Sequence, residues 1–305
     1  MDVLSDVVAI MRSGRPTSAR VVWHAPWGQR FPEVRGSAGF QVILRGSCRL
    51  ITSGAGPVEL GAGDVLFFPH GDGYGLADAP ATPLAEPVCD PTADAELFVS
   101  GFVGNSGPAT VTLCGGFRLD PGRAHPLLRD LPGVVHLPAR AERHSGLRAA
   151  VELLGREVEQ PGLGAATVVP ALLDTLLIYI LRAWFTERPE QGGRWAAALA
   201  DPVVAAALQA MHQEPAHPWT VQSLADRAGL SRAAFAHRFT ALVGRPPLGY
   251  LTWWRLTLAA RALRETDALL SEVAARVGYR SEFAFANAFK REYGTAPGRY
   301  RRQSA

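Results

Sequence analysis

Apolar and polar residues follow two different patterns along the chain, with a change near residue 140. Before this point, short apolar runs alternate with turns rich in Gly and Pro, which is typical of the strands of a sandwich or a closed barrel. After it, apolar residues recur at helical spacing to the end of the chain. The sequence therefore predicts a multidomain α+β protein, in which a small β-barrel is followed by helices.

The expected strands are short and closely spaced. In residues 40–44, the apolar Phe40, Val42 and Leu44 occupy every second position, a period that predicts a strand with one buried face. Further apolar runs predict strands at Cys48–Thr52, Val65–Phe68, Leu97–Phe102 and Thr110–Leu113.

Two helices are expected next. The first ends near Pro161 and has one apolar face, formed by Leu147, Val151, Leu154 and Val158. The second has a wider apolar stripe, formed by Leu172, Leu173, Leu176, Leu177, Ile180, Leu181 and Trp184. This stripe either packs on the barrel and the neighbouring helix or forms the self-complementary face of a two-fold dimer, and the dimer is the favoured interpretation. Residues 187–193, with a proline and paired glycines, are expected to be a linker.

The last third of the chain contains an internal repeat. Ala225 and Gly229 recur 49 positions later, and six further residues recur at an offset of 50, namely Ser231, Phe235, Phe239, Gly244, Pro247 and Tyr250. In each copy a glycine can end one helix, a serine can cap the next, and a Phe pair four residues apart can form its buried face. The sequence therefore predicts two helix-turn-helix motifs, at about 221–242 and 270–293, joined by a helix at 248–265.

Within that joining helix, one face is predicted to point inward, formed by Tyr250, Leu251, Trp254, Leu258 and Ala262.

Composition and charge narrow the function. The chain has 305 residues, 48% of them hydrophobic and 19% charged, which suits one or two compact domains and argues against a disordered chain. Residues 217–305 hold 14 Lys and Arg against 6 Asp and Glu, a net charge of +8, whereas the remainder has a net charge of −5. This asymmetry fits a polyanion as the partner of the last third and fits a solvated basic face equally well.

Several observations point to a soluble cytoplasmic protein. The first ten residues carry Asp2 and Asp6 where a signal peptide would be basic. The apolar stretch from residue 168 to residue 185 includes Pro170, Asp174 and Arg182, so a membrane span is not expected. The 3 cysteines are too few, and of odd number, for a disulfide scaffold.

The last hundred residues resemble the AraC/XylS-type DNA-binding domain. The resemblance rests on the repeat and on a run of residues near the end of the chain, namely Val277, Gly278, Tyr279, Ser281, Phe289, Lys290, Arg291, Gly294, Pro297, Tyr300 and Arg301. It implies a transcription regulator, an activator or a repressor, that binds double-stranded DNA and contacts RNA polymerase. The homodimer is expected from the apolar stripe described above. The domains are expected at 1–140 for an effector sensor, 141–190 for a helical connector and dimerisation segment, and 200–305 for DNA binding.

The β-rich part resembles a cupin, the sensor of one AraC-type subgroup. Gly63, Pro69 and Gly71 have the spacing of the second cupin motif, but Tyr74 stands where that family has a metal-binding histidine, and Gln41 is the best-placed residue in the first motif. Neither is a good metal ligand, so no metal, cofactor or catalysis is expected.

The barrel is instead expected to hold one small effector near Gln41 and Tyr74. His24 and His70 are interpreted as hydrogen-bonded structural residues. The alternative function is a cupin-type metalloenzyme, a dioxygenase or isomerase, with an appended DNA-binding domain.

Helix geometry and the family resemblance together assign the DNA contacts. The Phe pairs face the core, so the opposite faces are predicted to meet DNA. By resemblance, the base-reading positions are Ala233, Ala236, His237, Glu282, Phe283, Ala286 and Asn287. The residues interpreted as phosphate contacts are Arg232, Arg238, Arg280, Lys290 and Arg291.

The three cysteines leave redox sensing as a second hypothesis for the first domain. Cys48 and Cys114 lie in expected strands, where a free thiol usually behaves as a small buried apolar group. Cys89 lies in a loop rich in Pro and Asp and is expected to be exposed, but its acidic neighbours Glu86 and Asp90 disfavour the reactive thiolate.

Overall fold

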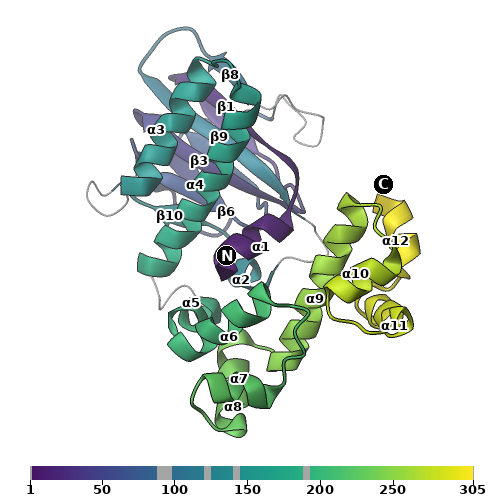
Figure 1. Ribbon diagram of the computed structural model, residues 1–305. Helices are drawn as coiled ribbons and strands as arrows, with labels where there is room; N and C mark the ends of the chain where they lie inside the picture. Colours follow the sequence, from purple (N-terminus) through teal and green to yellow (C-terminus); the bar gives the residue numbers. More distant parts are fainter. Residues whose placement is uncertain (1, 88–97, 120–124, 140–144, 188–192, 305) are drawn as a thin grey trace. The chain divides into compact units, whose positions relative to one another are not determined.

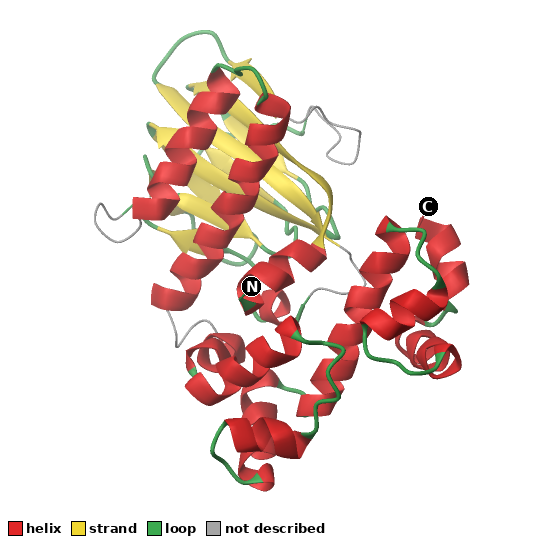
Figure 2. Cartoon of the chain, viewed as in Figure 1, coloured by secondary structure: helices red, strands yellow, loops and turns green. Residues whose placement is uncertain are grey.

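The chain folds into two compact units, one with all of the strands and one entirely helical (Figures 1 and 2). The computed structural model describes residues 2–87, 98–119, 125–139, 145–187 and 193–304. The first unit is Met11–Gly192, and the second combines Met1–Ile10 with Gly193–Ala305. This division differs from the expected domains, because the two connector helices belong with the sheets and the first ten residues belong with the helical unit.

The first unit is built on two sheets. The six-stranded sheet has the order β10-β6-β3-β9-β1-β8, and the four-stranded sheet has the order β2-β7-β4-β5. Strand β8 is parallel to β1, and the other pairs are antiparallel. The strands are β1 Arg12–His24, β2 Gly28–Phe31, β3 Ser37–Arg45, β4 Ser47–Ile51, β5 Val58–Gly61, β6 Val65–Phe68, β7 Tyr74–Ala77, β8 Phe98–Val103, β9 Ala109–Leu119 and β10 Val135–Leu137. All five predicted strands are present.

Strand β3 is buried on both faces, so the prediction of one buried face was wrong. Ile43 packs with Leu66 and Leu76 in a core formed by both sheets. Phe40 and Val42, which point to the opposite face, are 0% exposed as well. The reason is the position of β3 in the middle of a sheet that has the second sheet on one side and helices on the other (Figure 1).

Helices α3 (Ser145–Glu159) and α4 (Ala165–Glu187) lie across one face of the six-stranded sheet (Figure 1). The apolar face predicted for α3 is confirmed by the burial of Leu147, Val151, Leu154 and Val158. The stripe of α4 is buried within the same chain, apart from the half-buried Leu172, so it packs on α3, β1 and β10. The structure therefore matches the packing interpretation of this stripe and not the dimer seam.

Helix α4 is also long and apolar enough to cross a membrane by length and composition. Its burial against the sheet explains this composition, since Leu173, Leu176 and Ile180 are 0% exposed.

The second unit consists of helices. They are α1 Val3–Met11, α5 Gly193–Ala200, α6 Pro202–Gln213, α7 Val221–Arg227, α8 Arg232–Val243, α9 Pro247–Glu265, α10 Leu270–Arg276, α11 Glu282–Tyr293 and α12 Pro297–Ser304. A short α2, Pro126–Arg129, lies in the first unit. Both predicted helix-turn-helix motifs are present, as α7–α8 and α10–α11. The expected linker lies largely outside the described residues.

The repeated glycines and serines have the predicted roles. Gly229 and Gly278 have φ angles of 64° and 82°, in the left-handed region that favours glycine. At Gly278, a Cβ atom would also lie 2.8 Å from the Ala216 carbonyl oxygen. Ser231 and Ser281 each accept a hydrogen bond from the backbone N–H three residues later, at 3.3 Å.

The joining helix α9 is buried more widely than the single predicted face. Tyr250, Leu251 and Trp254 are buried as expected, whereas Leu258 and Ala262 are only half-buried. Seven further buried residues were not predicted, namely Pro247, Trp253, Leu256, Thr257, Ala259, Ala260 and Leu263. The reason is that α9 packs against α8 as well as against α10, α11 and α12.

Candidate nucleic-acid interface

Helix α8 presents one exposed face because the opposite face is fixed in the core. Phe235 and Phe239 are 0% exposed, and Gly244, with φ of 77°, ends the helix. The side opposite this Phe pair carries Ala233 and His237, both exposed. Among the other predicted contacts on α8, Arg232 is exposed and Ala236 is half-buried.

Helix α11 repeats this arrangement. Phe285 and Phe289 are 0% exposed, whereas Phe283 is 78% exposed. Glu282 and Asn287 are exposed and Ala286 is half-buried. Three of the four predicted base-reading positions on α11 are therefore exposed.

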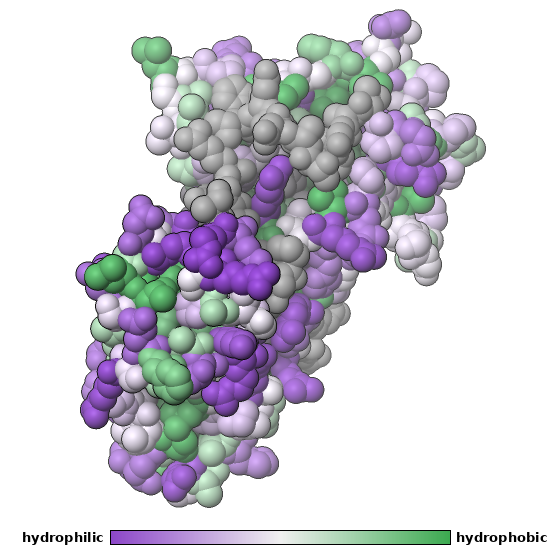
Figure 3. Space-filling model, turned by 90° about the vertical axis from the view of Figure 1, so that its right-hand side faces the viewer, coloured by the Kyte–Doolittle hydropathy of each residue, from purple (hydrophilic) through white to green (hydrophobic). Residues whose placement is uncertain are grey.

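Four of the predicted phosphate contacts are exposed cations with no ion-pair partner among the residues that the structure describes. They are Arg232, Arg280, Lys290 and Arg291. On the face drawn in Figure 3, hydrophilic side chains cover much of the helical unit, with apolar patches between them. Such a surface suits the phosphate backbone of a nucleic acid.

Arg238 differs from these four, because it is held by a partner within its own unit. Its Nε donates to Asp201 Oδ2 at 2.7 Å. Asp201 caps α6 by accepting from the backbone N–H groups of Val203 and Val204, both at 3.0 Å. Burial of Asp201 raises its pKa, but the hydrogen bonds from Val204 and Arg238 outweigh this and hold the pKa below its ordinary value. Arg238 therefore ties α8 to the start of α6, a positioning role that the sequence analysis missed.

Arg255 of α9 is a second positioning residue that the sequence analysis missed. Its Nε donates to the carbonyl of Pro215 at 2.5 Å and its Nη2 to that of His217 at 2.8 Å. Burial lowers its pKa, with an opposing contribution from Tyr279. Arg255 thus fixes the loop that leads into α7. The local sequence contains no signal for this contact, because its partners are backbone carbonyls about 40 residues away.

The barrel interior brings together the two residues singled out as the effector site. Gln41 Nε2 donates to the Tyr74 hydroxyl at 2.9 Å. The Tyr74 ring stacks on Phe68 at 3.8 Å and on Phe31 at 4.7 Å between centroids. Gln41 is 0% exposed, and its Oε1 has no hydrogen-bond partner within the described part of the chain. Burial raises the pKa of Tyr74 well above its ordinary value, so the phenol is neutral.

The two histidines that the sequence analysis singled out in the barrel have the contacts expected of structural residues. His24 Nδ1 lies 3.2 Å from the Gly107 carbonyl oxygen, and His70 Nε2 lies 2.9 Å from that of Leu131. Within the described ranges, no three His, Cys, Asp or Glu side chains come together as a metal site would require.

The cysteines differ in their surroundings. Cys48 is 3% exposed, and burial followed by the charge of Asp64 raises its pKa to about 12. Cys114 is half-buried, with Sγ 3.5 Å from the Ala19 carbonyl oxygen. Cys89 lies outside the described residues. The raised pKa argues against Cys48 as a redox sensor, because the thiolate is the reactive form.

Cys48 is therefore expected to resist alkylation in the folded protein. With a pKa of about 12, only about one thiol in ten thousand is ionised at pH 8. Iodoacetamide treatment at pH 8 followed by peptide mass spectrometry should find Cys48 unmodified. The same treatment in urea should modify it fully. Modification of the native protein at the rate of a free thiol would show that Cys48 is accessible and ionised.

Comparisons with known proteins agree with both halves of the fold. A family model described as cupin matches residues 2–186, and one described as a helix-turn-helix domain matches residues 224–303. An AraC-like transcription regulator of Streptomyces lividans is 36% identical over 99% of this chain and 98% of its own length. A second, from Streptomyces antibioticus, is 36% identical over 99% of both chains.

Solved structures similar to this chain include the DNA-binding domain of the global transcriptional factor AdpA in complex with a target DNA. It is 36% identical, covers 34% of this chain and 92% of that chain, and has a TM-score of 0.33.

Proposed function

Because the chain belongs to the AraC-like transcription regulators, we propose that it reads one asymmetric DNA site through both of its helix-turn-helix motifs. The chain is a DNA-binding transcription regulator with a cupin-like ligand-sensing domain. The observation that carries the proposal is the pair of exposed faces on α8 and α11, each opposite a buried Phe pair.

The length of the joining helix sets the size of the proposed site. Helix α9 has 19 residues, which at 1.5 Å per residue is about 28 Å. One turn of DNA is about 34 Å, and the two helix-turn-helix bodies add to the length of α9. Helices α8 and α11 would then enter successive major grooves, and one unit would cover about two turns.

The exposed residues have side chains suited to reading bases. The His237 imidazole can donate to guanine, Asn287 can pair with the edge of adenine, and Glu282 can accept from cytosine. Phe283 can pack on a thymine methyl group, as can the small residues Ala233, Ala236 and Ala286.

Selection of DNA from a random duplex pool tests this function. We expect the full-length protein to retain one asymmetric sequence and hydroxyl-radical footprinting to show protection of the backbone that flanks two successive major grooves. Protection of one groove for each protein unit would overturn the two-groove proposal. Retention of all sequences alike would overturn sequence-specific reading.

The phosphate contacts predict a change in salt dependence. Replacing Arg291 with Ala should weaken binding to all sequences equally and should lower the slope of log K against log salt by about 0.9, the value for one phosphate. The measurement is fluorescence anisotropy at several salt concentrations. Arg238→Ala is the matched comparison: since Asp201 holds this side chain, its loss should mainly lower the unfolding temperature. An unchanged slope for Arg291→Ala would contradict its phosphate role.

The cupin domain is proposed to bind a small effector in its interior. The unpaired Gln41 Oε1 and the nearby Tyr74 hydroxyl offer polar contacts among stacked aromatic rings, which suits a small ligand that carries a hydrogen-bond donor. A thermal-shift screen over a metabolite panel tests this, with Gln41→Leu as the variant that should lose the shift. Redox sensing remains the alternative, through Cys114 or Cys89.

We also propose that the barrel has no catalytic role, since Gln41 and Tyr74 stand where cupins of this type have histidines. Metal analysis of the purified protein decides this, because stoichiometric iron, manganese or zinc would favour the metalloenzyme instead. The remaining proposals are a cytoplasmic location, contact with RNA polymerase, and a homodimer. Since the α4 stripe is covered, the dimer contact has to use other residues.

A further inference from the structure

The first helix of the chain is part of the helical unit. Residues Met1–Ile10 group with Gly193–Ala305, and α1 is capped by Asp2, which accepts from the backbone N–H and the hydroxyl of Ser5 at 3.1 and 2.7 Å. Val7 of α1 is 0% exposed, and the carboxylate-bearing Asp6 beside it is only 8% exposed. A buried carboxylate is costly unless it has a partner.

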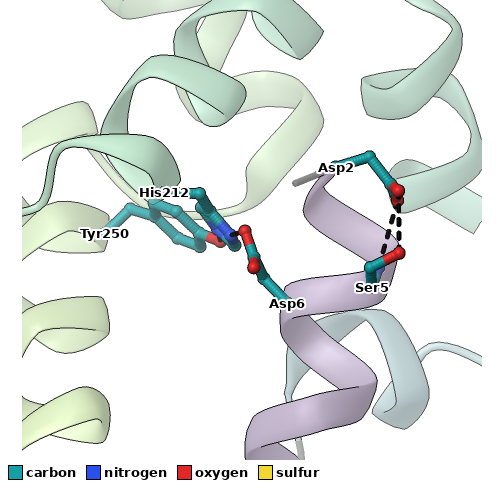
Figure 4. Close-up of polar contacts among 5 residues, drawn as sticks. All are labelled: Asp2, Ser5, Asp6, His212 and Tyr250. Atoms are coloured by element: carbon teal, nitrogen blue, oxygen red, sulfur yellow. Dashed lines mark hydrogen bonds and ion pairs between the residues drawn. The ribbon is translucent and has the colours of Figure 1, made fainter.

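The partner of Asp6 is His212 of α6, as Figure 4 shows. His212 Nδ1 lies 3.3 Å from Asp6 Oδ2, and His212 Nε2 lies 2.7 Å from the Tyr250 hydroxyl of α9. Burial lowers the pKa of His212, although Asp6 opposes this, so the ring is neutral at pH 7. The neutral imidazole then donates from Nδ1 to Asp6 and accepts at Nε2 from the Tyr250 O–H.

Ring contacts extend this chain of hydrogen bonds to the joining helix and to α8. The His212 ring stacks on Trp254 with centroids 3.8 Å apart and an interplanar angle of 18°. Tyr250 meets Phe239 of α8 edge-on at 6.0 Å. Asp6 is thus connected through His212 to α6 and α9, the two helices that flank the first helix-turn-helix motif in the sequence.

We propose that Asp6 is a positioning residue of the DNA-binding unit, which acts through His212 to fix α6 against α9 and so sets the separation of the two recognition helices. Without Asp6, the Nδ1–H group of His212 would be buried without an acceptor, and the ring would be free to move away from Tyr250. The contact supports binding and does not block it, because His237 and Asn287 are exposed while α1 is in place.

The position of α1 in the chain suits a role in regulation. Helix α1 ends at Met11, and β1 of the sensor sheet begins at Arg12. A change in β1 on effector binding would therefore act directly on the helix that carries Asp6.

The test compares Asp6 variants on two DNA duplexes. One duplex carries the site that the full-length wild-type protein selects, and the other has one base pair inserted between the two contacted segments. Asp6→Ala should lower the ratio of the two affinities about tenfold, the size of one charge-assisted hydrogen bond. Asp6→Asn keeps an acceptor for His212 and should restore most of the ratio. Asp2→Ala weakens the helix cap but leaves His212 paired, so it should keep the wild-type ratio.

Two results would overturn this role for Asp6. If Asp6→Ala lowered both affinities equally, the residue would only stabilise the fold, and if it changed neither affinity, the contact would be unimportant for DNA binding. The proposal rests on sequence-specific DNA binding, so hydrogen exchange provides a separate readout. Asp6→Ala should speed amide exchange in α6 and in the first half of α9 even if the wild-type protein selects no sequence, and unchanged exchange there would also overturn the proposal.

Discussion

Replacing Leu176 with glutamate is expected to unfold the first unit rather than to separate a dimer. Leu176 is 0% exposed in the layer between α4 and the six-stranded sheet. A glutamate there would place a carboxylate in an apolar core without a partner, at a cost of about 4–5 kcal/mol or more. Urea denaturation followed by circular dichroism should show the midpoint falling steeply or no folded β signal at all.

Thr175→Glu is the control for this prediction. Thr175 is the neighbouring residue on the exposed face of the same helix, so its replacement should change the unfolding free energy by only about 0.5 kcal/mol. If Leu176→Glu instead gave a folded monomer from a wild-type dimer, the stripe would be the dimer seam that the sequence favoured.

His237→Ala and Asn287→Ala are expected to relax sequence preference at opposite ends of the DNA site. His237 lies on α8 and Asn287 on α11, and both are exposed. Each loss should cost about 1–3 kcal/mol of discrimination at one or two base pairs. Competition binding against a set of single-base-pair variants of the selected site measures this cost position by position.

Arg232→Ala and Lys290→Ala are matched controls on the same two helices. They should weaken binding at every position alike, since phosphate contacts carry no direct sequence information. If His237→Ala and Asn287→Ala relaxed the same base pairs, the two helices would not occupy separate grooves.

The sequence by itself determined the features that depend on residues close together in the chain. The two helix-turn-helix motifs could be predicted because a left-handed glycine, a capping serine and a Phe pair each act within about one turn of helix. The exposed faces of α8 and α11 were predicted from the same spacing, as the sides opposite the two Phe pairs. Five of the strands in the described residues, β3, β4, β6, β8 and β9, could be predicted from apolar runs between turns, whereas β1, β2, β5, β7 and β10 were not predicted.

Only the tertiary structure decided the features that depend on distant partners. The period of two in residues 40–44 could not reveal that β3 has neighbours on both faces. The α4 stripe has the composition of a dimer seam or of a core face, and its contacts with α3 and the sheet select the second.

The same distinction explains what was missed in the helical unit. Arg238 has the sequence features of a phosphate contact, but Asp201, 37 positions away, holds its side chain. Asp6 and His212 are 206 positions apart, and each alone has the sequence features of a solvated polar residue. Their pairing depends on the fold bringing α1 against α6, where exclusion of water makes a hydrogen bond between them necessary.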